Sequence, residues 1–141
     1  MPAIRRQVNI AAAQRAVWNA LTTAEGLTSW WADEARIEPR AGGRVVIGNK
    51  NGEDQLTEDR GFIHTWRPTS RLEIAFDNVG TSELKGTRLS FSLARDGDET
   101  LLAMVHSGGD ALEEEARRQA LDDEWKRAFK ALQTHLDQEP S

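Results

Sequence analysis

Hydrophobic and polar residues alternate along most of the chain with the period of two that is typical of β-strands. The clearest example is Leu89, Phe91 and Leu93, which are separated by serines. Similar patterns predict strands at about residues 4–10, 35–37, 44–48, 58–66, 71–77, 85–95 and 99–106. Because one face of each strand is polar, the strands should form an antiparallel sheet with its other face buried.

Turn signals separate several of these strands. Pro39 followed by Gly42 and Gly43 predicts a turn that needs a positive φ angle. Asn51-Gly52 is a pair that favours tight hairpins. The strands from residue 35 onward should therefore follow one another as a meander.

Two short helices are predicted between the first and second strands. Ala13, Val17 and Leu21 recur at helical spacing and indicate a helix over about residues 13–21. Residues 22–25 (TTAE) have the form of a capping box and predict the start of a second helix. In that helix Leu27, Trp30 and Trp31 would share one face.

A long helix is predicted at the end of the chain. Asp110 and Glu113 have the spacing of a capping box, and no residue from there to Gln138 breaks a helix. A helix of about 28 residues would be about 42 Å long and could cross a whole sheet. Its apolar stripe consists of Leu121, Trp125, Ala128, Phe129, Leu132 and Leu136.

The order β-α-α-β6-α predicts an α+β fold made of one domain, residues 1–141. The long helix would pack across a curved antiparallel sheet, and the two short helices would close one end. Between helix and sheet we expect an apolar pocket, because five tryptophans supply large flat surfaces.

Composition narrows the classes of function. The net charge is −5 and no basic block is present, so we expect no nucleic-acid partner. No apolar run is long enough to span a bilayer, and the N-terminus lacks the apolar segment of a signal peptide. The chain has no cysteine, which suits a reducing compartment. We therefore expect a cytoplasmic protein without membrane insertion.

Several motifs resemble those of a known family. Residues 17–21 (VWNAL) and 27–31 (LTSWW) resemble the opening of bacterial proteins similar to the activator of heat-shock protein 90 ATPase. The resemblance continues along the chain through Pro39, Gly42, Gly43, Gly61, Pro68, Arg71, Leu72, residues 86–89 (GTRL), residues 105–108 (VHSG) and Trp125, Phe129, Leu132 and Leu136. Two positions depart from it: Glu124 replaces the usual glycine before the closing tryptophan, and Gly109 replaces a frequent aromatic residue.

This family belongs to the START-like (SRPBCC) superfamily, whose helix-grip fold includes the birch pollen allergen. The resemblance implies that fold, but the superfamily contains lipid carriers, cyclases and co-chaperones. Three functions therefore stay open. They are a binding module for a small apolar or amphipathic molecule, a co-chaperone acting on the heat-shock protein 90 ATPase, and a cyclase- or hydrolase-type enzyme. The first is the leading hypothesis.

Nine side chains are candidate ligand contacts because they are large, apolar or inward-facing. They are Trp30, Trp31, Trp66, Phe76, Phe91, Met104, His106, Trp125 and Phe129. For the tryptophans, a role in filling the core competes with a role in stacking against a ligand.

His106 shares strand parity with Leu102 and Met104 and should point inward. It is either a hydrogen-bonded histidine near the end of the sheet or a polar anchor for a ligand. Arg6 interrupts an apolar strand face, where it could pair with a carboxylate or reach a ligand.

Signatures of catalysis or of a cofactor are missing from the sequence. There is no glycine-rich phosphate loop, nucleophile elbow or cysteine, and no spacing identifies a carboxylate–histidine acid–base pair. His64 and His135 lie in different elements from His106, which argues against a histidine metal site. We expect no catalytic residue, metal or cofactor.

Overall fold

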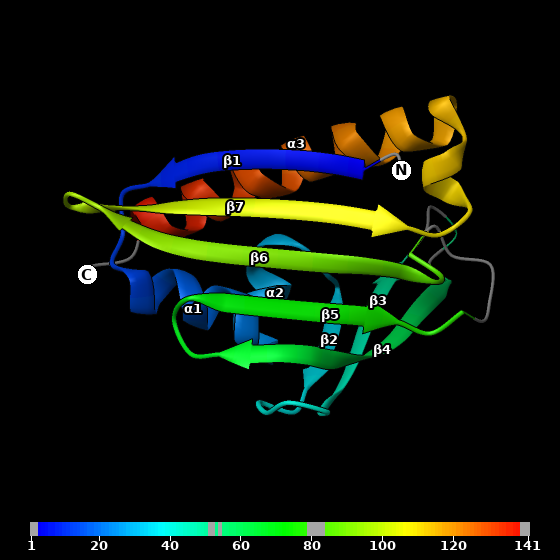
Figure 1. The fold of residues 1–141 in the computed structure, drawn as a ribbon, viewed down its shortest axis with the longest axis horizontal. Helices are drawn as coiled ribbons and strands as arrows, with labels where there is room; N and C mark the ends of the chain where they lie inside the picture. Colours follow the sequence, from blue (N-terminus) through cyan, green and yellow to red (C-terminus); the bar gives the residue numbers. More distant parts are fainter. Residues whose placement is uncertain (1–2, 51–52, 54, 79–83, 139–141) are drawn as a thin grey trace.

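The computed structural model describes residues 3–50, 53, 55–78 and 84–138. In this part of the chain, seven antiparallel strands form one sheet in the order β1-β7-β6-β5-β4-β3-β2 (Figure 1). Strand β1 (Ala3–Ile10) lies at one edge, and helices α1 (Gln14–Thr22) and α2 (Ala24–Trp30) carry the chain to the opposite edge. The chain then returns strand by strand until the last strand pairs with β1.

The returning meander contains strands of very different length. They are β2 (Glu34–Ile37), β3 (Arg44–Lys50), β4 (Leu56–Arg67), β5 (Arg71–Phe76), β6 (Thr87–Asp96) and β7 (Glu99–Gly108). A short 3-10 helix, η1 (Ala111–Glu113), and the long helix α3 (Glu115–Gln138) follow.

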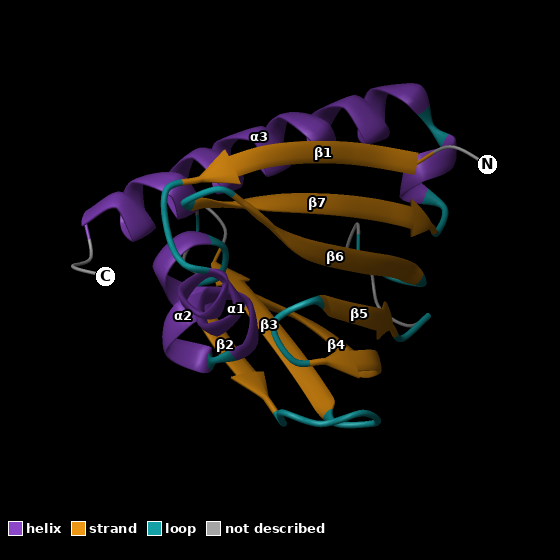
Figure 2. Ribbon diagram, turned by 60° about the vertical axis from the view of Figure 1, so that its left-hand side comes forward, coloured by secondary structure: helices purple, strands orange, loops and turns teal. Residues whose placement is uncertain are grey.

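The helices pack on the concave side of the curved sheet (Figures 1 and 2). Alternate residues of the strands point to this side and are buried, as Leu72 and Ile74 are in β5 and Leu89 and Phe91 in β6. From α3, Leu121, Trp125, Phe129, Leu132 and Leu136 enter the same core. The α+β helix-grip fold and the predicted apolar stripe of α3 are confirmed. That residues 1–141 form a single domain stays a prediction.

A β-bulge in β4 changes which side chains face inward. Ile63 pairs with Ile74 and Trp66 pairs with Leu72, and the register shifts between Ile63 and Thr65. The extra residue brings both Ile63 and Trp66 to the concave face although they are three positions apart. Simple alternation would have placed them on opposite faces.

Both predicted capping boxes are wrong in detail. The cap of α2 is Thr23, whose Oγ1 accepts from the amide of Gly26 at 2.9 Å, while Thr22 is the last residue of α1. Gly26 has no side chain to reach back, so the cap is one-sided.

The long helix also begins later than its sequence pattern predicts. Asp110 makes no side-chain capping hydrogen bond, and Glu114 is extended, so α3 starts at Glu115 and has 24 residues. The break is stabilised by Arg118, whose guanidinium donates to the carbonyl of Leu112 at 2.7 Å.

The turn predicted at Gly42-Gly43 is present. Gly42 has φ +79°, the left-handed region that favours glycine. At Gly43, a Cβ atom would lie 2.2 Å from the carbonyl oxygen of Glu38, so the backbone approaches too closely for a side chain. The hairpin predicted at Asn51-Gly52 lies outside the described residues.

The two edges of the sheet differ. At the β1 edge, Gln133 of α3 donates to the carbonyl of Asn9 at 3.1 Å, and Arg6 pairs with Asp122 of α3 at 2.9 Å. Of the two roles expected for Arg6, pairing with a carboxylate is therefore the one that the structure shows. At the other edge, β2 is only four residues long.

No helix in the described part of the chain is long and apolar enough to cross a membrane.

Candidate functional site

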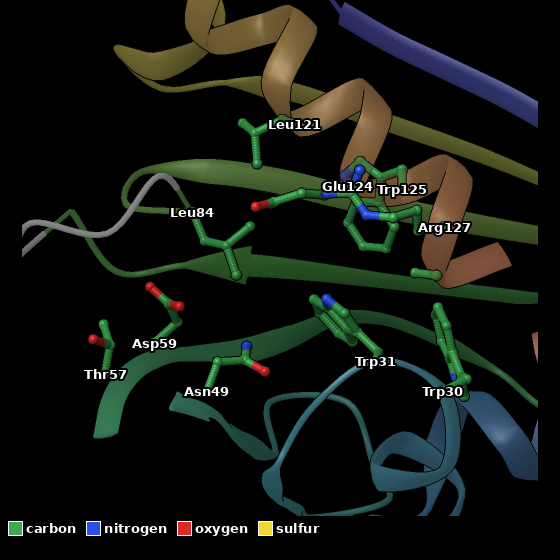
Figure 3. Close-up of a pocket in the computed structure, with 11 residues that line it drawn as sticks. Trp30, Trp31, Asn49, Thr57, Asp59, Leu84, Leu121, Glu124, Trp125 and Arg127 are labelled. Carbon is green, nitrogen blue, oxygen red and sulfur yellow. The ribbon is translucent and has the colours of Figure 1, made fainter. Parts of the chain in front are cut away.

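A cavity of about 500 Å³ opens between α3, the end of α2, the C-terminal end of β3 and the N-terminal end of β4 (Figure 3). It is lined by Trp30, Trp31, Asn49, Thr57, Asp59, Leu84, Leu121, Glu124, Trp125, Arg127 and Ala128.

One wall of the cavity is aromatic. The rings of Trp31 and Trp125 have centroids 5.2 Å apart, and Trp30 stacks on Trp31 at 5.8 Å. Trp30 is fixed by a hydrogen bond from its Nε1 to the carbonyl of Ala20 at 2.9 Å. Since Trp31 is only half-buried, it presents apolar surface to the cavity.

The opposite wall is polar because the inward-facing side chains change from apolar to polar toward the end of β3 and the start of β4. In β3, Val45 and Ile47 are fully buried, but the next inward position is Asn49. Asn49 pairs with Thr57 and Ile47 pairs with Asp59, so β4 presents two further polar side chains at the same level. The sheet therefore offers an amide, a hydroxyl and a carboxylate.

Helix α3 adds charges at the rim. Glu124 and Arg127 are exposed and flank Trp125 along the helix. Glu124 is the position at which the sequence departs from the glycine of the resembled motif, and it lies at the cavity. Gly109, the other departure, is not among the lining residues. A Cβ atom there would lie 2.6 Å from Thr87 Cγ2.

A chain of hydrogen bonds lies behind the aromatic wall. Trp125 Nε1 donates to Nδ1 of His106 at 3.1 Å, and Nε2 of His106 lies 2.9 Å from Thr87 Oγ1. Thr87 Oγ1 in turn donates to the carbonyl of Leu84 at 2.6 Å. Because an indole N–H can only donate, Nδ1 must accept, and the proton of His106 is on Nε2. The chain thus connects Trp125 and Leu84, which line the cavity from two different elements.

His106 is neutral in this arrangement. Its side chain has 0% exposure, and burial lowers its pKa from 6.5 to about 4. A second proton on the ring would sit on Nδ1 and oppose the N–H of Trp125. The expectation of a hydrogen-bonded histidine near the end of the sheet is met. Its alternative role as a polar anchor for a ligand stays a prediction.

The structure brings together only some of the nine predicted ligand contacts. Trp30, Trp31 and Trp125 line the cavity. The buried side chains that do not line it are Phe76, Phe91, Met104, His106 and Phe129. Trp66 is half-buried and packs edge-on against Trp18, with ring centroids 5.1 Å apart. Contact of any of the nine with a ligand stays a prediction.

The sequence reasoning misses the other residues of the lining. They are Asn49, Thr57, Asp59, Leu84, Leu121, Glu124, Arg127 and Ala128. Strand parity carries a signal for some of them. Asn49 has the same parity as the buried Val45 and Ile47, and Asp59 has the same parity as the buried Ile63, so both should point to the inner face of the sheet. No sequence signal places Leu84, which precedes β6.

Residues 11–137 match the model of the family described as "Activator of Hsp90 ATPase homolog 1-like protein". The chain belongs to this family. No sequence among the curated proteins is significantly similar to it.

Solved structures support the same fold for this family member. An Aha1 dimer from Colwellia psychrerythraea has a TM-score of 0.82 and 20% identity, with 100% of both chains covered. A protein from Mesorhizobium loti has a TM-score of 0.80 and 18% identity, with 99% of each chain covered. CalU16 from Micromonospora echinospora has a TM-score of 0.76 and 22% identity, over 99% of this chain and 76% of that one. At these identities the likeness concerns the fold alone.

Proposed function

We propose that this family member is a cytoplasmic binding protein that holds a small apolar or amphipathic molecule in the cavity beside α3. The observation that carries the proposal is the joining of an aromatic wall, Trp30, Trp31 and Trp125, to a polar wall built by β3 and β4. Pockets for small molecules commonly have this composition, with apolar area for affinity and a few polar groups for orientation.

The size of the cavity fits such a ligand. Ligand pockets commonly measure roughly 300–1,000 Å³, and this cavity is about 500 Å³. Its aromatic wall is held in place from behind by the hydrogen bonds of Trp30 and Trp125. A rigid wall lowers the cost of ordering side chains when a ligand binds.

Calorimetric titration with a panel of fatty acids, sterols and phenylalkyl compounds tests the proposal. Trp31→Ala removes an aromatic surface that faces the cavity, and we expect it to weaken binding by about tenfold. Trp66→Ala is the matched control, because Trp66 is also half-buried but lies against Trp18. If no member of the panel binds, and native mass spectrometry finds no co-purified ligand, the proposal is wrong.

A second candidate function is activation of the heat-shock protein 90 ATPase. The family match over residues 11–137 supports it. The test is the ATPase rate of the chaperone with and without the protein. An unchanged rate over a range of concentrations would exclude this function.

A further inference from the structure

We propose that the cavity selects an organic cation, an amine or quaternary ammonium group carried on an apolar tail. This inference rests on the proposed binding function and names the chemical class of its ligand.

The charges around the cavity favour a positive ligand. Among the described lining residues there are two carboxylates, Asp59 of β4 and Glu124 of α3, and one cation, Arg127. Figure 3 shows the two carboxylates projecting from opposite walls, one from the sheet and one from the helix. The net charge of −5 on the whole chain adds to the attraction.

The aromatic wall strengthens this preference. The indole rings of Trp31 and Trp125 are tilted by 38° to each other with centroids 5.2 Å apart. They form one aromatic surface on the wall of the cavity. Cations are attracted to the faces of aromatic rings, and tryptophan is the strongest of these partners. A head group near Trp31 would then interact with rings and carboxylates together.

The lining also provides for the tail. Figure 3 shows Leu84 and Leu121 beside the carboxylates of Asp59 and Glu124, with Trp30 at the other end of the cavity and Trp31 between them. A fatty acid whose tail lies along Trp30 would bring its own carboxylate toward Asp59 and Glu124, where like charges repel. A neutral alcohol would gain the apolar contacts and hydrogen bonds to the polar wall, but no attraction between opposite charges.

Three ligands with the same phenylhexyl tail test the inference: 6-phenylhexylamine, 6-phenylhexanol and 7-phenylheptanoate. They share the apolar tail and differ in the charge of the head group. At pH 7 we expect the amine to bind about tenfold more tightly than the alcohol, and the acid to bind most weakly. The difference should shrink as salt is added, because the rim charges are exposed and screened.

Variants identify the charges responsible. Glu124→Gln should reduce the preference for the amine over the alcohol by about threefold. This is the usual contribution of one exposed ion pair, here between the ligand's ammonium group and the Glu124 carboxylate. Asp123→Asn is the matched control: it makes the same change of charge at the neighbouring helix position, which does not line the cavity. Arg127→Gln should change affinities in the opposite sense and raise that of the amine. Thermal unfolding establishes that each variant is folded.

The outcomes separate this inference from the binding function itself. A preference for the amine that Glu124→Gln lowers and Asp123→Asn leaves intact supports the inference. Equal binding of the three ligands, or tightest binding of the acid, overturns it while the binding function stands. Equal losses in Glu124→Gln and Asp123→Asn also overturn it, since a general charge effect would then explain the preference. Absence of binding by all three ligands overturns both.

Discussion

Replacing Trp125 by alanine is expected to lower the free energy of unfolding by about 3–5 kcal/mol, the usual cost of truncating a large buried aromatic side chain. Trp125 is 3% exposed and its ring contacts those of Trp30, Trp31, Phe91 and Phe129. The variant would also leave Nδ1 of His106 without its donor. Chemical denaturation followed by circular dichroism measures the loss.

Two further variants divide this effect into its parts. Trp125→Phe keeps most of the apolar contact and removes the hydrogen bond, so it should cost about 1–3 kcal/mol, the penalty of an unsatisfied buried acceptor. Lys126→Ala changes the next, exposed position of α3 and should have little effect. A loss below about 1 kcal/mol for Trp125→Ala would mean that the aromatic cluster does not stabilise the fold as described.

The second large effect is a loss of stability in mild acid. Burial lowers the pKa of His106 from 6.5 to about 4. Between these pH values the unfolded chain binds a proton that the folded protein excludes, so the free energy of unfolding falls as the pH falls. The contribution is fully present above pH 6.5 and is lost by about pH 4. The total is about 3 kcal/mol at 1.36 kcal/mol per pKa unit.

Denaturation curves measured across this pH range check the prediction when they are compared with those of His106→Gln. The amide of glutamine can accept from Trp125 and donate to Thr87, yet it does not titrate. The difference between the two proteins isolates His106. Glu73 contributes to both alike, its pKa being lowered by hydrogen bonds from Thr65 and Arg71.

A second histidine variant serves as the control. His64→Gln removes an exposed histidine that pairs with Glu73 at 3.4 Å and leaves His106 in place, so its curve should still show the acid loss assigned to His106. If His106→Gln loses stability in acid as steeply as the wild type, the buried histidine is not the cause.

The fold follows from the sequence because its main determinants are periodic. Alternation along β6 and the stripe from Leu121 to Leu136 each extend over many residues, and long periodic segments leave few ways to bury their apolar faces. Ends of elements depend on single local contacts instead. Thr22 and Thr23 are equally good caps by type, and only the geometry of the turn selects Thr23.

The cavity is harder to predict, because it depends on where side chains fail to fill space. Phe91, Met104 and Phe129 are inward-facing as expected, but they pack so closely that they belong to the core rather than to the cavity. Leu84 joins the lining through the hydrogen bond from Thr87, a contact that sequence spacing does not encode. Asp59 lies inward by parity, although its charge suggests an outward position.

The unequal edges of the sheet have a consequence for how the protein behaves at high concentration. A strand with free backbone donors and acceptors can template the addition of a strand from another molecule. Here the carbonyl of Asn9 on β1 accepts a hydrogen bond from Gln133 of α3. At the other edge, β2 has only four residues and is too short to pair with a long strand. The architecture that builds the cavity therefore also leaves less of the two sheet edges open to the addition of a strand.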